Sequence, residues 1–249
     1  MGARAGSAAR AAVRLDADHV ALLARGRWPL RHLSLGRNDI RKAGAEALAA
    51  AAFARTLRVL ELPGCGITAG GVQALADAPE LAGLRHLDLS GNPVGPGGLD
   101  ALAAGPHLRG LRALNLGGTN SARGPVAARD VARFLSVLAA PELRHLNLDG
   151  LPVGARGARV LASAPAFANL TRLDLDHCGL GSAGVGAVAR SKVLANLVAL
   201  DLSQNRAGGG AGRLAGAGAF PRLARCFLHA NPLPRSTAAR LRRRPGVRV

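Results

Sequence analysis

One hexapeptide pattern recurs along most of this chain and constrains its fold more than any other feature. The pattern L-x-x-L-x-L occurs eight times, and successive copies begin 27, 27, 27, 32, 27, 27 and 26 residues apart. The copies begin at Leu30, Leu57, Leu84, Leu111, Leu143, Leu170, Leu197 and Leu223. A unit this short cannot bury its own apolar face, so neighbouring units must stack into a continuous core. The spacing therefore predicts a solenoid.

Each copy carries the signals of one strand followed by a turn. The last two leucines are two residues apart, which places both on one face of a short strand. Eight residues after each start lies a signature position, which holds Asn38, Cys65, Asn92, Thr119, Leu151, Cys178, Asn205 and Asn231. An Asn there can bond the backbone groups of adjacent turns, which would otherwise be buried without partners. Leu151 cannot, so we expect this ladder to be weakest in repeat five.

The remainder of each repeat has the pattern of a helix. A small residue recurs six positions after the signature position, and an apolar residue follows four later, as in Gly44 with Leu48. Apolar residues three and four apart turn one helix face inward. Each repeat is thus predicted to be one strand and one helix, which makes the chain an α/β protein.

The 27-residue register, with L-x-x-L-x-L-x-x-N/C-x-L followed by a G-x-x-x-L helix, resembles the ribonuclease-inhibitor-like subclass of leucine-rich repeats, including its bacterial arrays. The resemblance covers residues 30 to about 233. It implies a curved horseshoe of about eight repeats, with a parallel sheet on the concave side and helices outside.

The two ends are predicted to differ from the repeats. Residues 1–29 form an N-terminal segment in which residues 16–26 read as a capping helix, begun by Asp16 or Asp18 and ended by Gly26. Apolar side chains expected to cover the first repeat are Val20, Leu22 and Leu23, with Trp28 nearby. Residues 234–249 are interpreted as a basic C-terminal cap made of a helix, a proline stop and a short strand.

Two repeats are irregular. Repeat four is five residues longer than its neighbours, and we expect the extra residues to lengthen a loop or helix on the convex side. Repeat seven is rich in glycine over residues 204–220, where a helix is expected. Glycine inside a helix costs about 1 kcal/mol relative to alanine, so this segment should be locally loose.

Composition bounds the function. The formal net charge of +18 suggests an acidic partner, yet 31 of the 33 basic residues are Arg, which a GC-rich coding bias would also produce. Cys65, Cys178 and Cys226 lie too far apart for a zinc motif and are expected to be buried packing residues. Catalytic motifs, cofactor motifs and a membrane-spanning segment are not found. A monomer in the cytoplasm is expected.

The face of the strands is the predicted binding surface. Residues at the second and fourth positions after each repeat start point away from the core, and an Arg column precedes the strands. The predicted contacts are Arg31, His32, Arg58, Glu61, Arg85, His86, Asp88, Arg112, Asn115, Arg144, His145, Asn147, Arg172, Asp174, Asp176, Asp201, Arg225 and Phe227. Asp149 adds a further acid. The Arg column has two interpretations, a solvated rim or half of a charged strip.

These features favour a non-enzymatic scaffold that binds a protein on its concave face. One alternative is a regulator of an enzyme, either an inhibitor or a GTPase-activating module, since certain activators resemble this repeat subclass. Another is binding of nucleic acid or an acidic surface through the Arg-rich tail after residue 234. The mixed charge of the strand face and the scarcity of aromatic residues argue against nucleic acid. Asp174, Asp176 and His177, with His145 and Asp149 of the previous repeat, have the ligand types of a metal site, but exposed polar residues of a strand face are expected instead.

Overall fold

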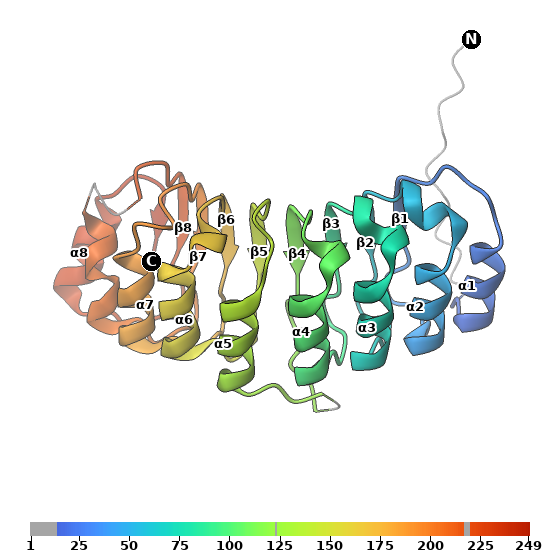
Figure 1. Cartoon of the computed structure of the whole chain (residues 1–249). Coiled ribbons are helices and arrows are strands. Elements are labelled where there is room, and N and C mark those ends of the chain that lie inside the picture. Colours follow the sequence, from blue (N-terminus) through green and yellow to red (C-terminus); the bar gives the residue numbers. More distant parts are fainter. Residues whose placement is uncertain (1–13, 123, 217–219) are drawn as a thin grey trace, which may run out of the picture.

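The chain folds into one row of repeats with strands on one side and helices on the other (Figure 1). The computed structural model describes residues 14–122, 124–216 and 220–249. Within these residues, nine parallel strands pair in the order of the sequence. The strands are β1 His32–Ser34, β2 Val59–Glu61, β3 His86–Asp88, β4 Ala113–Asn115, β5 His145–Asn147, β6 Arg172–Asp174, β7 Ala199–Asp201, β8 Arg225–Phe227 and β9 Val247–Arg248.

Helices form the second layer. The α-helices are α1 Ala17–Ala24, α2 Arg41–Ala49, α3 Ala69–Asp77, α4 Gly95–Ala104, α5 Ala128–Val137, α6 Gly154–Ser163, α7 Gly181–Ala189 and α8 Arg235–Arg242. Short 3₁₀ helices are η1 Ala52–Thr56, η2 Pro79–Gly83, η3 Pro106–Leu108, η4 Pro165–Phe167 and η5 Gly208–Ala215. The predicted alternation of strand and helix is confirmed in repeats one to six.

The leucines of the repeat build a single core between the two layers. In each of β2 to β6 the middle leucine is buried, and it pairs with the middle leucine of the next strand, as Leu60 does with Leu87. The flanking residues of the same strands lie on the opposite face. Because side chains alternate along a strand, this register points the residues two and four positions after each repeat start away from the core.

Buried asparagine side chains tie the turns together. The Oδ1 atom of Asn92 accepts the backbone N–H groups of Cys65 (2.8 Å) and Ile67 (3.0 Å) in the preceding repeat. Its Nδ2 atom donates to the carbonyls of Leu62 (2.7 Å) and Leu89 (2.8 Å). One side chain therefore satisfies four backbone groups of two adjacent turns, two of each polarity.

The asparagine bonds lie toward the two ends of the solenoid and are absent from its middle. Asn205 and Asn231 each accept two N–H groups from the preceding repeat, as Asn92 does. In repeats four and five the signature residues are Thr119 and Leu151, and neither receives such a bond. The N–H groups of these two residues instead bond local carbonyls, that of Thr119 to Leu116 (3.3 Å) and that of Leu151 to Leu148 (2.9 Å). The predicted weak point at repeat five therefore extends over two repeats.

The position before each signature residue has a left-handed backbone. Its φ is positive in all eight repeats, between 51° at Ala230 and 75° at Gly150. Four repeats place glycine there, which adopts this conformation freely, and the other four place a residue with a side chain. The non-glycine residues are Arg37, His177, Gln204 and Ala230. Such residues are strained by the contact of Cβ with the backbone.

The first turn of α1 is capped by Asp16, whose carboxylate accepts the N–H groups of Asp18 and His19. Val20 is fully buried and Leu23 packs against the core, but Leu22 is 61% exposed. The prediction for Leu22 is therefore wrong, because it lies on the outer face of α1. Trp28 is also exposed. Residues 1–13 of the predicted N-terminal segment lie outside the described residues.

The C-terminal segment is folded against the last repeats. Helix α8 buries Leu241, and β9 adds to the sheet beside β8, with Cys226 opposite Val247. The guanidinium of Arg244 donates to the backbone carbonyls of Leu214, Gly216 and Phe220. At least one tail arginine is therefore a structural link between α8 and repeat seven rather than a free charge.

The two irregular repeats depart from the pattern in different layers. In repeat four the extra residues lie in the loop between β4 and α5, which has twelve residues against six between β5 and α6. Helix α5 is as long as α4, so the alternative of a lengthened helix is wrong. In repeat seven the glycine-rich segment forms the 3₁₀ helix η5 in place of an α-helix. Its glycines disfavour the α-helix that the other repeats adopt.

Candidate functional site

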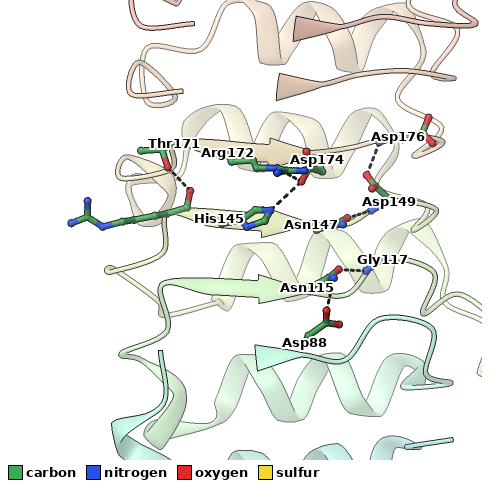
Figure 2. A network of polar contacts seen from close by, with 11 residues as sticks. Asp88, Asn115, Gly117, His145, Asn147, Asp149, Thr171, Arg172, Asp174 and Asp176 are labelled. Atoms are coloured by element: carbon green, nitrogen blue, oxygen red, sulfur yellow. Dashed lines mark hydrogen bonds and ion pairs between the residues drawn. The ribbon is translucent and has the colours of Figure 1, made fainter. Parts of the chain in front are cut away.

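The concave face of the sheet carries polar side chains that bond across neighbouring strands. Near the N-terminal end, Nε2 of His32 on β1 lies 3.2 Å from Oε2 of Glu61 on β2. This contact outweighs the opposing effect of burial and holds the pKa of Glu61 below its usual value. On β3 and β4, the Asn115 amide donates to Asp88 over 2.9 Å, as Figure 2 shows.

The residue four positions after each repeat start is also the last residue of its strand. The side chain there accepts the N–H two residues later, as in Asn115 with Gly117 (3.0 Å) and Asn147 with Asp149 (2.8 Å). Asp88 and Asp201 make the same bond to the serines that follow them. This side-chain turn explains why Asp and Asn recur at this position, and it was not among the sequence predictions. The Asp and Asn side chains at the strand ends therefore stabilise the turns as well as forming part of the exposed polar surface.

Asp174 lies at the centre of the polar network (Figure 2). Its side chain is only 9% exposed, and its Oδ2 atom contacts Nε2 of His145 (3.1 Å) and Nε of Arg172 (2.8 Å). Burial alone would raise the pKa of Asp174, but the hydrogen bonds with His145 and Arg172 lower it overall. Asp174 thus orients its two neighbours instead of offering an open carboxylate to a partner.

A second carboxylate cluster lies where β5, β6 and β7 end. Oδ1 of Asp149 accepts the N–H of Asp176 (2.9 Å), and both oxygens of Asp176 accept the amide of Gln204 (3.1 Å each). Burial, together with the charges of Asp174, Asp201 and Asp176, raises the pKa of Asp149 to about 6. The chain therefore concentrates negative potential at this point of the sheet despite its large positive net charge.

The Arg column does not form one uniform strip. The residues stack in register, with each N–H of Arg58, Arg85 and Arg112 bonded to the preceding arginine's carbonyl. The Arg58 guanidinium donates to the carbonyl of its own neighbour Leu57 (2.8 Å). That of Arg85 donates to the carbonyl of Gly110 (2.8 Å). These two guanidinium groups contact loop carbonyls, which supports the interpretation of a rim for them.

The other predicted contacts have fewer neighbours. Arg112 has an ion pair with Glu142 at 4.0 Å, and Arg31, Arg144 and Arg225 are exposed. His86 is exposed on β3. Phe227 is half-buried on β8, with its ring centroid 5.8 Å from that of His229. The predicted residues near β5–β7 are therefore brought together, whereas those near both ends of the sheet are spread out.

The three cysteines lie in the core. Cys65, Cys178 and Cys226 are free and fully buried, as predicted. Burial raises the pKa of each thiol, that of Cys226 to about 12, so the reactive thiolate is disfavoured. The Sγ atoms of Cys65 and Cys178 each donate to a leucine carbonyl of the preceding repeat over 3.1 Å. Two of the cysteines thus take over part of the asparagine role.

Neither a metal site nor a membrane-spanning helix is found in the part of the chain that the structure describes. No three His, Cys, Asp or Glu residues there are grouped so that they could hold a metal ion. No helix there is both long and apolar enough to cross a bilayer.

A family profile described as Leucine Rich repeat matches residues 29–49, 53–76, 84–103 and 168–189. These segments coincide with four of the eight repeats. These segments are leucine-rich repeats, and the row of repeats has the fold of a leucine-rich-repeat solenoid. Leucine-rich-repeat proteins typically act in protein–protein interaction, and the curvature of a solenoid provides an extended concave surface for it.

Solved structures support the same fold. An internalin from Listeria monocytogenes superposes with a TM-score of 0.61 at 18% identity, covering 94% of this chain and 56% of the internalin. A second internalin from the same strain gives a TM-score of 0.55 at 19% identity, covering 94% of this chain and 82% of the other. This solenoid thus spans little more than half of the first relative. No curated protein matches the sequence significantly.

Proposed function

We propose that the solenoid is a non-enzymatic scaffold that binds a protein partner on its concave face, at a surface centred on β5–β7. The observation that carries the proposal is the carboxylate cluster of Asp149, Asp176 and Asp201, to which the covered Asp174 adds charge. Burial first, and then the charges of the other three carboxylates, raise the pKa of Asp149. Like charges crowded at a surface are relieved when an opposite charge approaches, so the partner should present Lys or Arg side chains.

Rigidity supports this role. Asp174, Asp176 and Asn147 are held by bonds to side chains or backbone within the sheet and its turns. Side chains that are already fixed lose little conformational entropy when a partner docks. The basic rim beside the strands would contact acidic groups at the edge of the same partner.

The experiment begins with capture of partners on the immobilised chain, identified by mass spectrometry, and continues with the purified partner. The test variant is Asp176→Asn combined with Asp201→Asn, which removes two charges while retaining hydrogen-bond acceptors. The control is Asp77→Asn combined with Asp100→Asn, which removes the same charge from α3 and α4 on the helix side.

A concave site predicts that the test variant binds the partner about tenfold more weakly, since each 1.4 kcal/mol corresponds to a factor of ten. The control variant should bind as the unmodified chain does. Added salt should reduce this difference. Equal binding by the test variant and the unmodified chain would refute the concave site.

We also propose two finer assignments. The 27-residue register and the α-helices of most repeats support membership in the ribonuclease-inhibitor-like subclass. Residues 1–29 and 234–249 are proposed as caps of a repeat region at 30–233. The burial of Val20 in α1 and of Leu241 in α8 supports this division, because both side chains cover core at an end of the row. Deleting either helix should lower the denaturation midpoint.

A further inference from the structure

The helix side of the solenoid has a hollow of about 760 Å³ near its C-terminal end, among α7, η5 and α8. These elements are the orange and red helices of Figure 1. The hollow is lined by Ala189, Arg190, Ser191, Lys192, Gly209, Gly212, Arg213, Gly216 and Arg240. Three of these residues are glycines of the irregular repeat seven. The absence of side chains at these positions helps to leave the hollow open, and a Cβ atom at Gly209 would contact nothing within 4 Å.

Four cationic side chains surround this hollow: Arg190 after α7, Lys192 beyond it, Arg213 in η5 and Arg240 in α8. All four are exposed. None has a side-chain hydrogen bond or an ion pair with another residue that the structure describes. Their donors are therefore available to a ligand, in contrast to Arg244, whose guanidinium is bonded to three backbone carbonyls.

The surrounding sequence offers no counter-charge. Residues 177–249 contain twelve Lys or Arg residues and a single acid, Asp201. Asp201 lies on β7 in the sheet, in the opposite layer, where it accepts the N–H of Ser203. The positive potential at the hollow is thus not neutralised by the chain itself, and it would attract anions.

Stabilisation of helix ends accounts for single charges but not for their gathering around one hollow. Basic side chains are favourable near the carboxyl end of any helix, because the last carbonyls carry partial negative charge. Yet the last turns of α2, α3, α4, α5 and α6 contain no basic residue. Arg213 and Arg240 lie in the last turns of η5 and α8, and Arg190 follows α7, as Arg25 follows α1 and Arg55 lies in the last turn of η1. What distinguishes this end of the solenoid is that three such arginines line one hollow.

We infer that this hollow binds a compact ligand that carries two or more phosphate groups. Its volume falls within the range of small-molecule sites, and guanidinium groups match phosphate oxygens in geometry and charge. No aromatic side chain lines it, so the stacking that holds the bases of single-stranded nucleic acid is missing. The site is independent of the concave face, and the ligand could be a soluble polyphosphate compound or a phosphorylated lipid headgroup.

Isothermal titration calorimetry with inorganic tripolyphosphate tests the inference on the full chain. We expect one site, weakened about tenfold by Arg213→Ser and by Arg240→Ser, because a charge-assisted hydrogen bond is lost in each. Gly209→Glu should weaken binding at least as much, by placing a negative charge at a position with free space. The matched control is Arg109→Ser, which removes an exposed arginine far from the hollow and should leave binding unchanged.

Two calorimetric results with tripolyphosphate would overturn the inference. One is no heat of binding for tripolyphosphate at low salt. The other is a loss of affinity that is the same for Arg109→Ser, or for Arg242→Ser, as for Arg213→Ser, since binding would then depend on net charge alone. Duplex DNA that binds more tightly than tripolyphosphate and is insensitive to Gly209→Glu would likewise assign the charge to a nucleic-acid surface.

The source of the phosphate groups is distinguished with vesicles. Co-sedimentation with vesicles that contain a bisphosphorylated inositol lipid, but not with phosphatidylcholine vesicles, would support a lipid headgroup if Arg213→Ser abolishes it. Tripolyphosphate binding without vesicle binding would support a soluble ligand.

Discussion

Replacement of Asn92 by leucine tests the argument that one side chain holds two turns together. Leucine already occupies the equivalent position in repeat five, where Leu151 is fully buried, so the slot accepts its shape. In repeat three, however, the substitution removes the acceptor of two buried N–H groups, those of Cys65 and Ile67, and the donor to two carbonyls.

The magnitude follows from these four bonds. A buried N–H that loses its partner costs about 1–3 kcal/mol, and a carbonyl with a second lone pair already engaged costs less. Two such N–H groups give a loss of about 2–6 kcal/mol in the free energy of unfolding. The lower end applies if both relax toward local carbonyls, as the N–H of Leu151 does. We expect about 3–4 kcal/mol, which is large for a single substitution.

Urea unfolding followed by circular dichroism measures the loss, and hydrogen exchange locates it. The amides of Cys65 and Ile67 should become the fastest-exchanging amides of their turn. Thr119→Asn is the complementary variant, since its side chain would reach the N–H groups of Asn92 and Val94 and stabilise by about 1 kcal/mol. A loss below about 1 kcal/mol for Asn92→Leu, with slow exchange at Cys65, would refute the reasoning.

The remaining predictions concern charge, backbone strain and exposure. Because the pKa of Asp149 is raised to about 6, the folded chain retains a proton that the unfolded chain releases near 3.8, so stability falls as pH rises through this interval. Asp149→Asn keeps the acceptor for Asp176 and should flatten this part of the curve in urea titrations at several pH values. Arg37→Gly should raise stability by about 0.5–1 kcal/mol in the same assay, because φ at this residue is 62°; Gly91→Ala should lower it. Leu22→Glu should change the melting temperature little, because Leu22 is exposed; a large decrease would show that it covers the first repeat after all.

The regular part of the fold could be predicted from spacing alone. The L-x-x-L-x-L pattern, repeated mostly at 27 residues, permits only one pairing of neighbouring strands. The paired middle leucines Leu60 and Leu87 confirm this register. The role of Asn92 followed from its chemistry at a turn. Leu22 was predicted wrongly because the helical period of a single eight-residue helix does not fix which apolar side chains face inward.

The candidate site was less predictable. The position of a residue along a strand shows whether its side chain points away from the core, but not which of these side chains bond to each other. Asp174 was expected on the surface and is instead covered by His145 of the preceding strand and Arg172 of its own strand. The hollow beside Arg213 depends on the conformation of η5, and the glycines of that segment indicated only a poor helix.

The interrupted asparagine ladder divides the solenoid into two cooperative blocks. Bonds from signature side chains join the turns of repeats one to three and again those of repeats five to eight, since Cys178 donates to the Leu148 carbonyl. The Thr119 side chain of repeat four bonds only within its own turn. In a row of units coupled only to their neighbours, the weakest interface is where a partly folded molecule separates. Under force or mild denaturant, the row should therefore open first at repeat four, near Thr119, and leave two folded halves, one bearing the N-terminal repeats and the other the basic hollow.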